Sequence, residues 1–357
     1  MRKNILDYKG TKEQLEIIIQ NKQNVCEKKV IPKKDGERNL IAVKPKCEFK
    51  KMQKALLDNF LSKIPISPSA KGFLKGSSYI NYLEEHIGHE AFLHMDIKDF
   101  FDSISIELLR DALKQFVGSN EDEEGYEENE IMNIILQLCT YEEKVPQGFL
   151  TSPAVSNIVF RRIDQRITKY CRSYQKERKV EIFYTRYADD LLFSSYGFIF
   201  KENKYFQKMI VHILRENGFK CNNRKTIYQS GKISLSGYVV CEDVHLSRKK
   251  LKNINTIIAQ FDNREKYDDK PFEIDRKKDI KEILKELNGK KMKKANGEIV
   301  VFSSTERLAH CVAGYRSYLI EILRAEHEDT RYSKQIRKKI RKLEKILDYL
   351  AEFAEEE

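Results

Sequence analysis

Three carboxylates in two distant segments are the side chains of this sequence best suited to metal-dependent chemistry. Asp189 and Asp190 follow Tyr187-Ala188, with strand-forming residues on both sides, so the pattern predicts that they occupy the tip of a hairpin over 183–195. Asp96 ends a second predicted strand, over 91–97, that runs from apolar residues into an acidic cluster. Because Asp also favours ordinary solvated turns, the Asp189-Asp190 pair alone would be a weak sign of a site.

A cluster of these three carboxylates would need bound cations. At ~4 Å and an effective dielectric constant of about 20, each pair of like charges repels by ~4 kcal/mol. Two Mg²⁺ ions, with Mn²⁺ as a substitute, would reverse the sign of that interaction, and carboxylates at the ends of adjacent strands suit a two-metal site for phosphoryl transfer. One ion would activate a primer 3′-hydroxyl, and the other would neutralise the triphosphate and the leaving pyrophosphate.

Hydrophobic spacing and turn residues predict the elements that position these carboxylates. We expect a hairpin over 31–43, a strand over 233–240, and helices over 11–25, 47–62, 131–140, 152–170, 205–217 and 333–353. Strands and helices that do not alternate strictly are typical of an α+β fold. Beyond about residue 246 the pattern becomes helical and basic, so we expect a catalytic unit over 1–245 and a smaller helical region over 246–357.

Composition indicates what type of partner the protein binds and in which compartment it works. The 357 residues carry a net charge of +11, which favours a polyanionic partner through counterion release. Seven scattered cysteines without a CxxC pair predict reduced thiols rather than a disulfide framework or a zinc site. The apolar runs are too short to span a membrane and the N-terminus leads into no signal peptide, so we expect a soluble cytoplasmic protein without a membrane partner.

Several blocks, in the same order, resemble reverse transcriptases, and the bacterial retron type most closely. They include the hairpin from Ile31, Met95-Asp96-Ile97-Lys98-Asp99-Phe100-Phe101, Pro146-Gln147-Gly148-Phe149-Leu150-Thr151-Ser152-Pro153, Tyr184-Thr185-Arg186-Tyr187-Ala188-Asp189-Asp190 and Ser234-Leu235-Ser236-Gly237-Tyr238-Val239. The resemblance implies a right-hand polymerase fold, with fingers and an antiparallel palm sheet over 1–245 and an α-helical, basic thumb over 246–357. It also implies RNA-directed DNA polymerase activity, a nucleotidyl transfer.

The same resemblance assigns roles to single residues. The catalytic metal ligands would be Asp96, Asp189 and Asp190, with Ile97 as a further metal ligand. The incoming nucleotide would be bound by Lys33, Arg38, Phe101, Gln147, Gly148 and Lys225. The primer and RNA would be bound by Ser236, Gly237, Tyr238, Arg337, Lys338 and Arg341.

The chemistry of the nucleotide-binding set suits these roles. Arg38 can form bidentate contacts to phosphate while Lys33 supplies a point charge, although two surface charges on a turn would look the same. Phe101 would exclude a 2′-hydroxyl and so favour deoxynucleotides, with a core phenylalanine as the alternative. Gly148 would allow close backbone approach beside Gln147. Lys225 would donate a proton to pyrophosphate.

Membership of the retron type implies specific partners. These are a dedicated structured non-coding RNA as template, its DNA product, deoxynucleotide triphosphates, and a separate effector protein in antiphage defence. Two blocks depart from the retron pattern: Tyr82-Leu83-Glu84-Glu85-His86 keeps only the histidine of N-A-x-x-H, and Leu235-Ser236-Gly237 stands where V-T-G is usual. The alternatives are another defence-associated reverse transcriptase, of the abortive-infection or unclassified groups, a catalytically inactive RNA-binding scaffold, or an RNA-dependent RNA polymerase.

Overall fold

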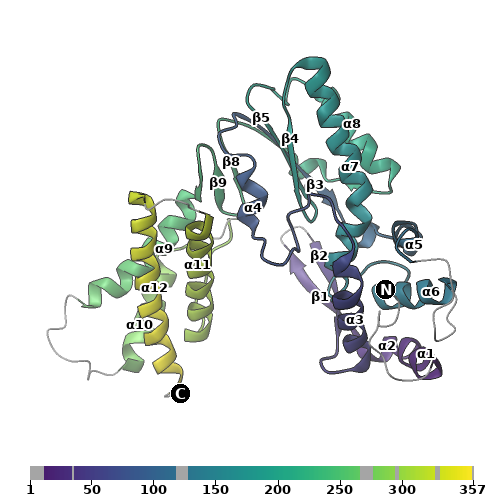
Figure 1. The fold of residues 1–357 in the computed structure, drawn as a ribbon. Coiled ribbons are helices and arrows are strands. Elements are labelled where there is room, and N and C mark those ends of the chain that lie inside the picture. The colour runs from purple at the N-terminus through teal and green to yellow at the C-terminus, as the bar shows by residue number, and fades with distance from the viewer. Residues whose placement is uncertain are drawn as a thin grey trace. The chain divides into compact units, whose positions relative to one another are not determined.

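The strand that carries Asp96 is buried along almost its whole length. In a computed structural model of the protein (Figure 1), every residue of β3 (Ala91–Lys98) except the last is buried, as expected for a strand covered on both faces. The structure describes residues 12–33, 36–117, 128–265, 276–293, 297–325 and 330–355. The chain divides into a first unit, Met1–Tyr82 with Ala91–Gln229, and a second unit, Leu83–Glu90 with Ser230–Glu357.

A five-stranded sheet forms the centre of the first unit. Its strand order is β4-β5-β3-β6, and β7 also pairs with β3. β5 pairs antiparallel with both β3 and β4, and β6 pairs antiparallel with β3. The other strands of this sheet are β4 (Phe183–Tyr187), β5 (Asp190–Ser195), β6 (Lys220–Cys221) and β7 (Ile227–Ser230). A separate antiparallel hairpin joins β1 (Cys26–Lys33) to β2 (Gly36–Val43).

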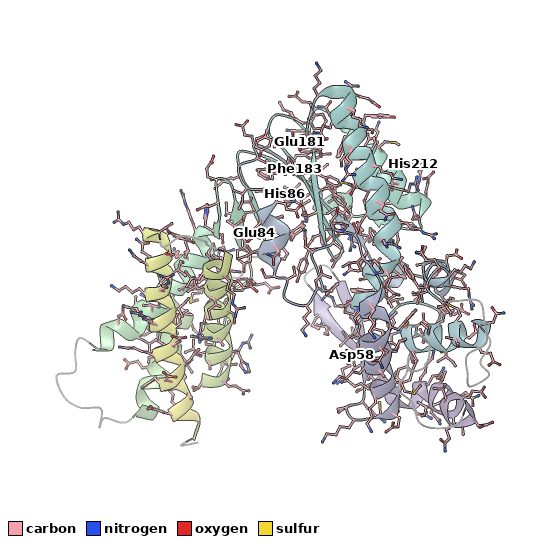
Figure 2. The ribbon with its side chains drawn as sticks, viewed as in Figure 1. Asp58, Glu84, His86, Glu181, Phe183 and His212 are labelled. Carbon is pink, nitrogen blue, oxygen red and sulfur yellow. The ribbon has the colours of Figure 1, made fainter. Side chains whose placement is uncertain are left out.

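Two helices lie side by side along this sheet. α7 (Ser152–Arg178) contacts β4 and α8, while α8 (Lys204–Glu216) contacts β6. Pro153 occupies the first turn of α7, where its missing N–H costs nothing. The side chains around the sheet are drawn in Figure 2, which labels Phe183 at the start of β4 and His212 on α8. The remaining helical elements are α1 (Lys12–Gln20), α2 (Lys22–Val25), α3 (Glu48–Asn59), η1 (Leu61–Lys63), α4 (Tyr79–Glu84), η2 (Phe101–Ser103), α5 (Ile106–Leu113), α6 (Glu128–Cys139) and η3 (Asn223–Lys225).

The second unit combines a small sheet with four helices. The sheet has the antiparallel order β10-β9-β8, from β8 (Ile233–Leu235), β9 (Tyr238–Val240) and β10 (Val244–Leu246). The helices are α9 (Arg248–Glu265), α10 (Arg276–Gly289), α11 (Thr305–Ala325) and α12 (Arg331–Glu355). α12 packs along α11 and buries a helically spaced apolar face formed by Ile336, Ile340, Leu343, Ile346 and Leu350.

The predicted α+β class is confirmed, as are the hairpins over 31–43 and 183–195 and the long helices. The prediction of one strand over 233–240 is wrong. Ser236 and Gly237 both have positive φ, 49° and 88°, so the chain turns there and two strands result. Among the described residues, the helices are too short or too polar to cross a membrane. A domain division after residue 245 stays a prediction.

Candidate functional site

The register of the central sheet brings the two acidic segments together. Asp96, near the end of β3, is the direct cross-strand partner of Asp190, the first residue of β5. The next amide along, that of Ile97, donates a hydrogen bond to the carbonyl oxygen of Asp189 at 2.9 Å. Cross-strand partners have Cβ atoms about 5 Å apart, so these carboxylates share one small volume. Successive side chains of a strand point to opposite faces, so the buried side chain of Ile97 lies on the other face from Asp96 and only its main chain can face this volume.

A strained tip presents Asp189. Ala188 adopts a positive φ of 55°, which is unfavourable for a residue with a Cβ atom. Arg186 stabilises this conformation, because its Nη1 donates to the carbonyl oxygen of Ala188 at 3.1 Å. The tip is therefore held from inside the protein as well as by its two strands.

Arg186 is itself part of a fully buried polar network. Its guanidinium pairs with both carboxylate oxygens of Asp164 on α7, through Nε–Oδ1 at 3.0 Å and Nη2–Oδ2 at 2.9 Å, and both side chains have 0% exposure. Nη2 also donates to Asn157, and Tyr184 donates its hydroxyl proton to Asp164 at 2.7 Å. Burial lowers the pKa of Arg186, but the charge and hydrogen bonds of Asp164 outweigh it and raise that pKa overall. The network links α7 to the hairpin tip.

A neighbouring loop packs against the other side of this tip. The Lys71 amide donates to the Arg186 carbonyl oxygen at 2.8 Å, and Arg186 donates its own amide to Ser69. A Cβ atom at Gly72 would lie 2.9 Å from the amide nitrogen of Ala188, so no side chain fits there. Asn157 donates to the Gly72 carbonyl oxygen and joins this loop to α7.

Burial and like charge both act on the carboxylates of this cluster. Burial, together with the nearby charge of Asp190, raises the pKa of Asp189 to about 6. Lys225 on η3 lies with its Nζ 2.6 Å from Oδ1 of Asp96. Burial alone would lower the pKa of Lys225, but the hydrogen bond and charge of Asp96 raise it above its ordinary value.

His94 is the second partner of the cluster. Its Nε2 lies 2.8 Å from Oδ1 of Asp190, and its side chain is only 8% exposed. Its Nδ1 is buried and has no hydrogen-bond partner within the part of the chain that the structure describes. The tautomer that donates from Nε2 to Asp190 is the one that avoids a buried, unpaired N–H. The oxygens of the three carboxylates are the atoms of this cluster that could bind a metal. Mg²⁺ and Mn²⁺ prefer such ligands, so the residues fit a pair of these ions.

The structure brings part of the predicted nucleotide-binding set together. The Gln147 carbonyl oxygen accepts a hydrogen bond from the Ile41 amide of β2 at 2.8 Å. A Cβ atom at Gly148, where φ is 111°, would lie 2.5 Å from the Ile41 carbonyl oxygen. The close approach predicted at Gly148 is thus made to β2, three residues from the exposed Arg38. Lys33 ends β1 opposite Gly36, and its side chain lies outside the described residues.

Phe101 lies five residues beyond Asp96, within a group of aromatic rings. Its ring centroid is 5.3 Å from that of Phe100 and 6.1 Å from that of Phe73. Phe73 in turn lies 6.2 Å from Tyr187, the residue at the end of β4. Phe101 is half-buried, so part of its ring remains accessible at the edge of the core.

The predicted primer contacts belong to the second unit. Lys250 supports the Ser236-Gly237 turn, because its Nζ donates to the Ser236 carbonyl oxygen at 3.1 Å and lies 3.0 Å from the ring centroid of Tyr318. Burial lowers the pKa of Lys250 to about 8. Tyr238 is 1% exposed and donates its hydroxyl proton to Glu321 at 2.6 Å, so its side chain serves to pack the turn.

The basic face of α12 is divided between internal contacts and solvent. Arg337, Lys338 and Arg341 are exposed. Lys339 and Lys342 instead bond to Asn255 and Asp262 of α9. Arg337, Lys338 and Arg341 are therefore accessible to a polyanion.

Sequence reasoning missed His94, Asn157, Asp164, Arg186 as a buried cation, and Lys250. A weak signal existed for two of them, since Asp164 interrupts the apolar face of a helix and Arg186 an otherwise apolar strand. Charged residues at such positions indicate a buried pair. Their partners depend on packing and cannot be read from spacing.

Comparison with known proteins shows which family the chain resembles. The family described as "Reverse transcriptase (RNA-dependent DNA polymerase)" matches residues 31–240. The retron Mx65 reverse transcriptase of Myxococcus xanthus is 30% identical over 241 residues, covering 64% of this chain and 54% of that protein. The retron Ec86 reverse transcriptase of Escherichia coli is 28% identical over 232 residues, covering 64% of this chain and 67% of that protein. The chain thus spans about half to two thirds of the length of these relatives.

Among solved structures, the telomerase of Candida albicans in complex with a fragment of telomeric RNA matches with a TM-score of 0.44 and 12% identity, over 91% of this chain and 66% of that one. A structural similarity of this size adds nothing to what the family match shows. The resemblance to retron reverse transcriptases indicated by the motifs is confirmed by the curated relatives.

Proposed function

The chain belongs to the reverse transcriptase family, and from this premise we propose that it is an RNA-directed DNA polymerase that works by two-metal phosphoryl transfer. The observation that carries the proposal is the cross-strand pairing of Asp96 with Asp190, next to Asp189. Three carboxylates in one small volume repel one another unless cations lie between them.

Asp96, Asp189 and Asp190 would hold two Mg²⁺ ions, or Mn²⁺ in their place, with the main chain of Ile97 as a further ligand. When bound, such ions lower the pKa of a primer 3′-hydroxyl and neutralise the triphosphate. The hydrogen bond from His94 occupies one oxygen of Asp190 and leaves the other for a metal. The strained Ala188 and the Arg186 network support the presentation of Asp189.

Lys225 would act on the triphosphate. Its Nζ contacts Asp96, and its side chain is 60% exposed, so it can turn from the carboxylate toward an incoming phosphate. The raised pKa of Lys225 means that Nζ carries a proton at neutral pH. Lys225 would thus neutralise the departing pyrophosphate and donate this proton to it.

Arg38 and Lys33 would grip the triphosphate from the β1–β2 hairpin, while Gln147 would contact the incoming nucleotide. The hydrogen bond between Gln147 and Ile41 couples that loop to the hairpin, which supports a joint role. Phe101 would exclude ribonucleotides by clashing with a 2′-hydroxyl. Phe101→Ala should then raise ribonucleotide incorporation at least about tenfold relative to deoxynucleotides. That result, with a wild type that discriminates against ribonucleotides, would argue against the RNA-dependent RNA polymerase alternative.

The turn at Ser236 and Gly237 would hold the primer end, with Tyr238 packing beneath it. Arg337, Lys338 and Arg341 of the helical C-terminal region, proposed as the thumb, would bind the phosphates of an RNA-containing duplex. Removing these three charges should weaken RNA binding and reduce its salt dependence.

The curated relatives are named as retron reverse transcriptases. As an enzyme of this type, the chain would copy a dedicated structured non-coding RNA into a DNA product, in cytoplasmic antiphage defence alongside a separate effector protein. Two blocks differ from the retron pattern, Tyr82-Leu83-Glu84-Glu85-His86 and Leu235-Ser236-Gly237. They support a second candidate, another defence-associated reverse transcriptase with its own primer.

Primer extension on an RNA template, with Mg²⁺ and deoxynucleotides, tests the proposal. We expect the wild type to extend the primer and Asp189→Asn to lose at least about a hundredfold in rate while still binding RNA. RNA binding without extension by the wild type, on RNA that co-purifies with the protein, would instead identify an inactive scaffold. Sequencing of that RNA, and of any DNA joined to it, separates a retron from the second candidate.

A further inference from the structure

A second group of metal-ligand side chains lies on the hairpin between β9 and β10, in the second unit. Cys241, Asp243 and His245 alternate along this segment with a spacing of two residues. The Cys241 amide donates to the Asp243 carbonyl oxygen at 3.0 Å and closes the turn, while His245 pairs with Val239 across the strands. Because the sequence has no CxxC pair, it predicted no zinc site. That criterion does not detect a site built from different types of ligand.

The three donor atoms converge. Nδ1 of His245 lies 2.7 Å from Oδ1 of Asp243, and Sγ of Cys241 lies 3.8 Å from the same oxygen. All three donor atoms can be chosen within 4.8 Å of one another. In a tetrahedral zinc site the ligands sit about 2.0–2.3 Å from the metal, hence roughly 3.3–3.8 Å from one another. Side-chain rotations that move the ligand atoms by about 1 Å would therefore suffice to place all three around one ion.

The main chain holds the cysteine in place. The Cys241 carbonyl oxygen accepts a hydrogen bond from the Gly88 amide at 2.7 Å, and its own amide is bonded to Asp243. Cys241 is thus fixed on both sides of its Cα atom, and His245 is fixed by its strand. Ligands on a rigid backbone bind more tightly, because little conformational freedom is lost on binding.

The chemistry of the donors selects the metal. One sulfur, one imidazole nitrogen and one carboxylate form a borderline-soft set that suits Zn²⁺ and suits Mg²⁺ poorly. One oxygen of Asp243 accepts a hydrogen bond from the Cys241 thiol and contacts Nδ1 of His245, so both other donors already face it. Since the side chain of Asp243 is 62% exposed, a fourth coordination position can open to water.

We propose that this hairpin binds one Zn²⁺ ion through Cys241 Sγ, Asp243 Oδ1 or Oδ2 and His245 Nδ1, with water as the fourth ligand. On binding, the Cys241 thiol releases its proton to solvent and the zinc–sulfur bond forms, with no change of oxidation state. The ion would tie together the two strands of the hairpin, one of which, β9, begins directly after the Ser236-Gly237 turn. The site shares no ligand with the Asp96, Asp189 and Asp190 cluster.

Zinc titration of the full chain tests this inference. The protein is first dialysed against a chelator and then titrated with zinc chloride alone, in millimolar Mg²⁺ so that oxygen-rich sites are filled. We expect about one zinc per chain, retained equally by Asp189→Asn and by the cysteine control Cys47→Ser. Cys241→Ser and His245→Ala should each weaken binding at least about tenfold. Zinc binding that is unchanged in both of these variants, or absent from the wild type at low micromolar zinc, would overturn the proposal.

Two measurements on the wild type do not depend on the folding of any variant. Substitution of Co²⁺ should produce a thiolate-to-cobalt charge-transfer band, and zinc should slow the alkylation of Cys241 by iodoacetamide relative to that of Cys47. Equal alkylation of Cys241 with and without zinc, together with no cobalt band, would contradict the site. Since both measurements are independent of polymerase activity, failure of the zinc site and failure of the proposed function remain distinguishable.

Discussion

His94 lies on β3, the strand that also carries Asp96, and its Nε2 atom is 2.8 Å from Oδ1 of Asp190 on β5. This contact sets the orientation of one carboxylate of the proposed metal cluster and occupies one of its two oxygens. A neighbour that orients a metal ligand typically changes metal affinity by about 10- to 100-fold when it is removed.

Removal of this donor should therefore weaken metal binding before it affects folding. We expect His94→Leu to raise the Mg²⁺ concentration for half-maximal activity at least about tenfold, and to reduce the rise in melting temperature that Mn²⁺ produces. His94→Gln, which keeps an N–H donor, should restore part of both. Equal Mg²⁺ dependence in the wild type and His94→Leu would show that the contact has no positioning role.

The buried charge of Asp189 should make the metal-free protein less stable at neutral pH. Its folded-state pKa of about 6 is above its ordinary value of 3.8, so its stabilising contribution is complete below about pH 4 and is lost as pH rises through 6. In a chelator at pH 7.5, Asp189→Asn should therefore unfold in urea with a free energy about 3 kcal/mol higher than that of the wild type.

The comparison at low pH is the control for this prediction. At about pH 4 the two proteins should be equally stable, because both then carry an uncharged side chain at position 189. Saturating Mg²⁺ at pH 7.5 should stabilise the wild type and leave Asp189→Asn nearly unchanged. A difference that persists at pH 4 would point to a packing effect of the amide.

Loss of one partner from the Arg186–Asp164 pair should cost about 3–5 kcal/mol of unfolding free energy, because the other charge stays buried without compensation. Arg186→Met tests this in urea denaturation. The matched control is Arg166→Met, which breaks the half-exposed ion pair with Glu216 and should cost less than about 1 kcal/mol. Similar costs for the two variants would refute the energetic role of burial.

Gly148 should tolerate no side chain, because a Cβ atom there would lie 2.5 Å from the Ile41 carbonyl oxygen. Gly148→Ala should separate β2 from the loop and raise the KM for deoxynucleotides more than it lowers kcat. Gly218→Ala is the matched control, since Gly218 also has a positive φ, 83°, but no atom within 4 Å of an added Cβ. It should cost only about 1 kcal/mol of stability. A KM change of equal size in both variants would contradict the docking of β2 by Gly148.

Local patterns in the sequence were sufficient to predict most elements and the candidate carboxylates. Alternation around Tyr187-Ala188-Asp189-Asp190 predicted a hairpin, the apolar run before Asp96 predicted a further strand, and the hydrophobic repeat over 333–353 predicted α12. These signals are local, because period and turn chemistry act over a few residues. The Ser236-Gly237 turn was also readable in this way, since Ser-Gly is a turn signal, and the strand predicted over 233–240 ignored it.

Which side chains meet depends on how the elements pack in three dimensions. The pairing of Asp96 with Asp190 depends on the register of β3 against β5, and a slip of one residue would turn Asp96 to the other face of the sheet. Arg186 reaches Asp164 only because α7 presents that residue to β4. Such contacts join residues far apart in the chain through the packing of whole elements, so spacing in the sequence carries no record of them.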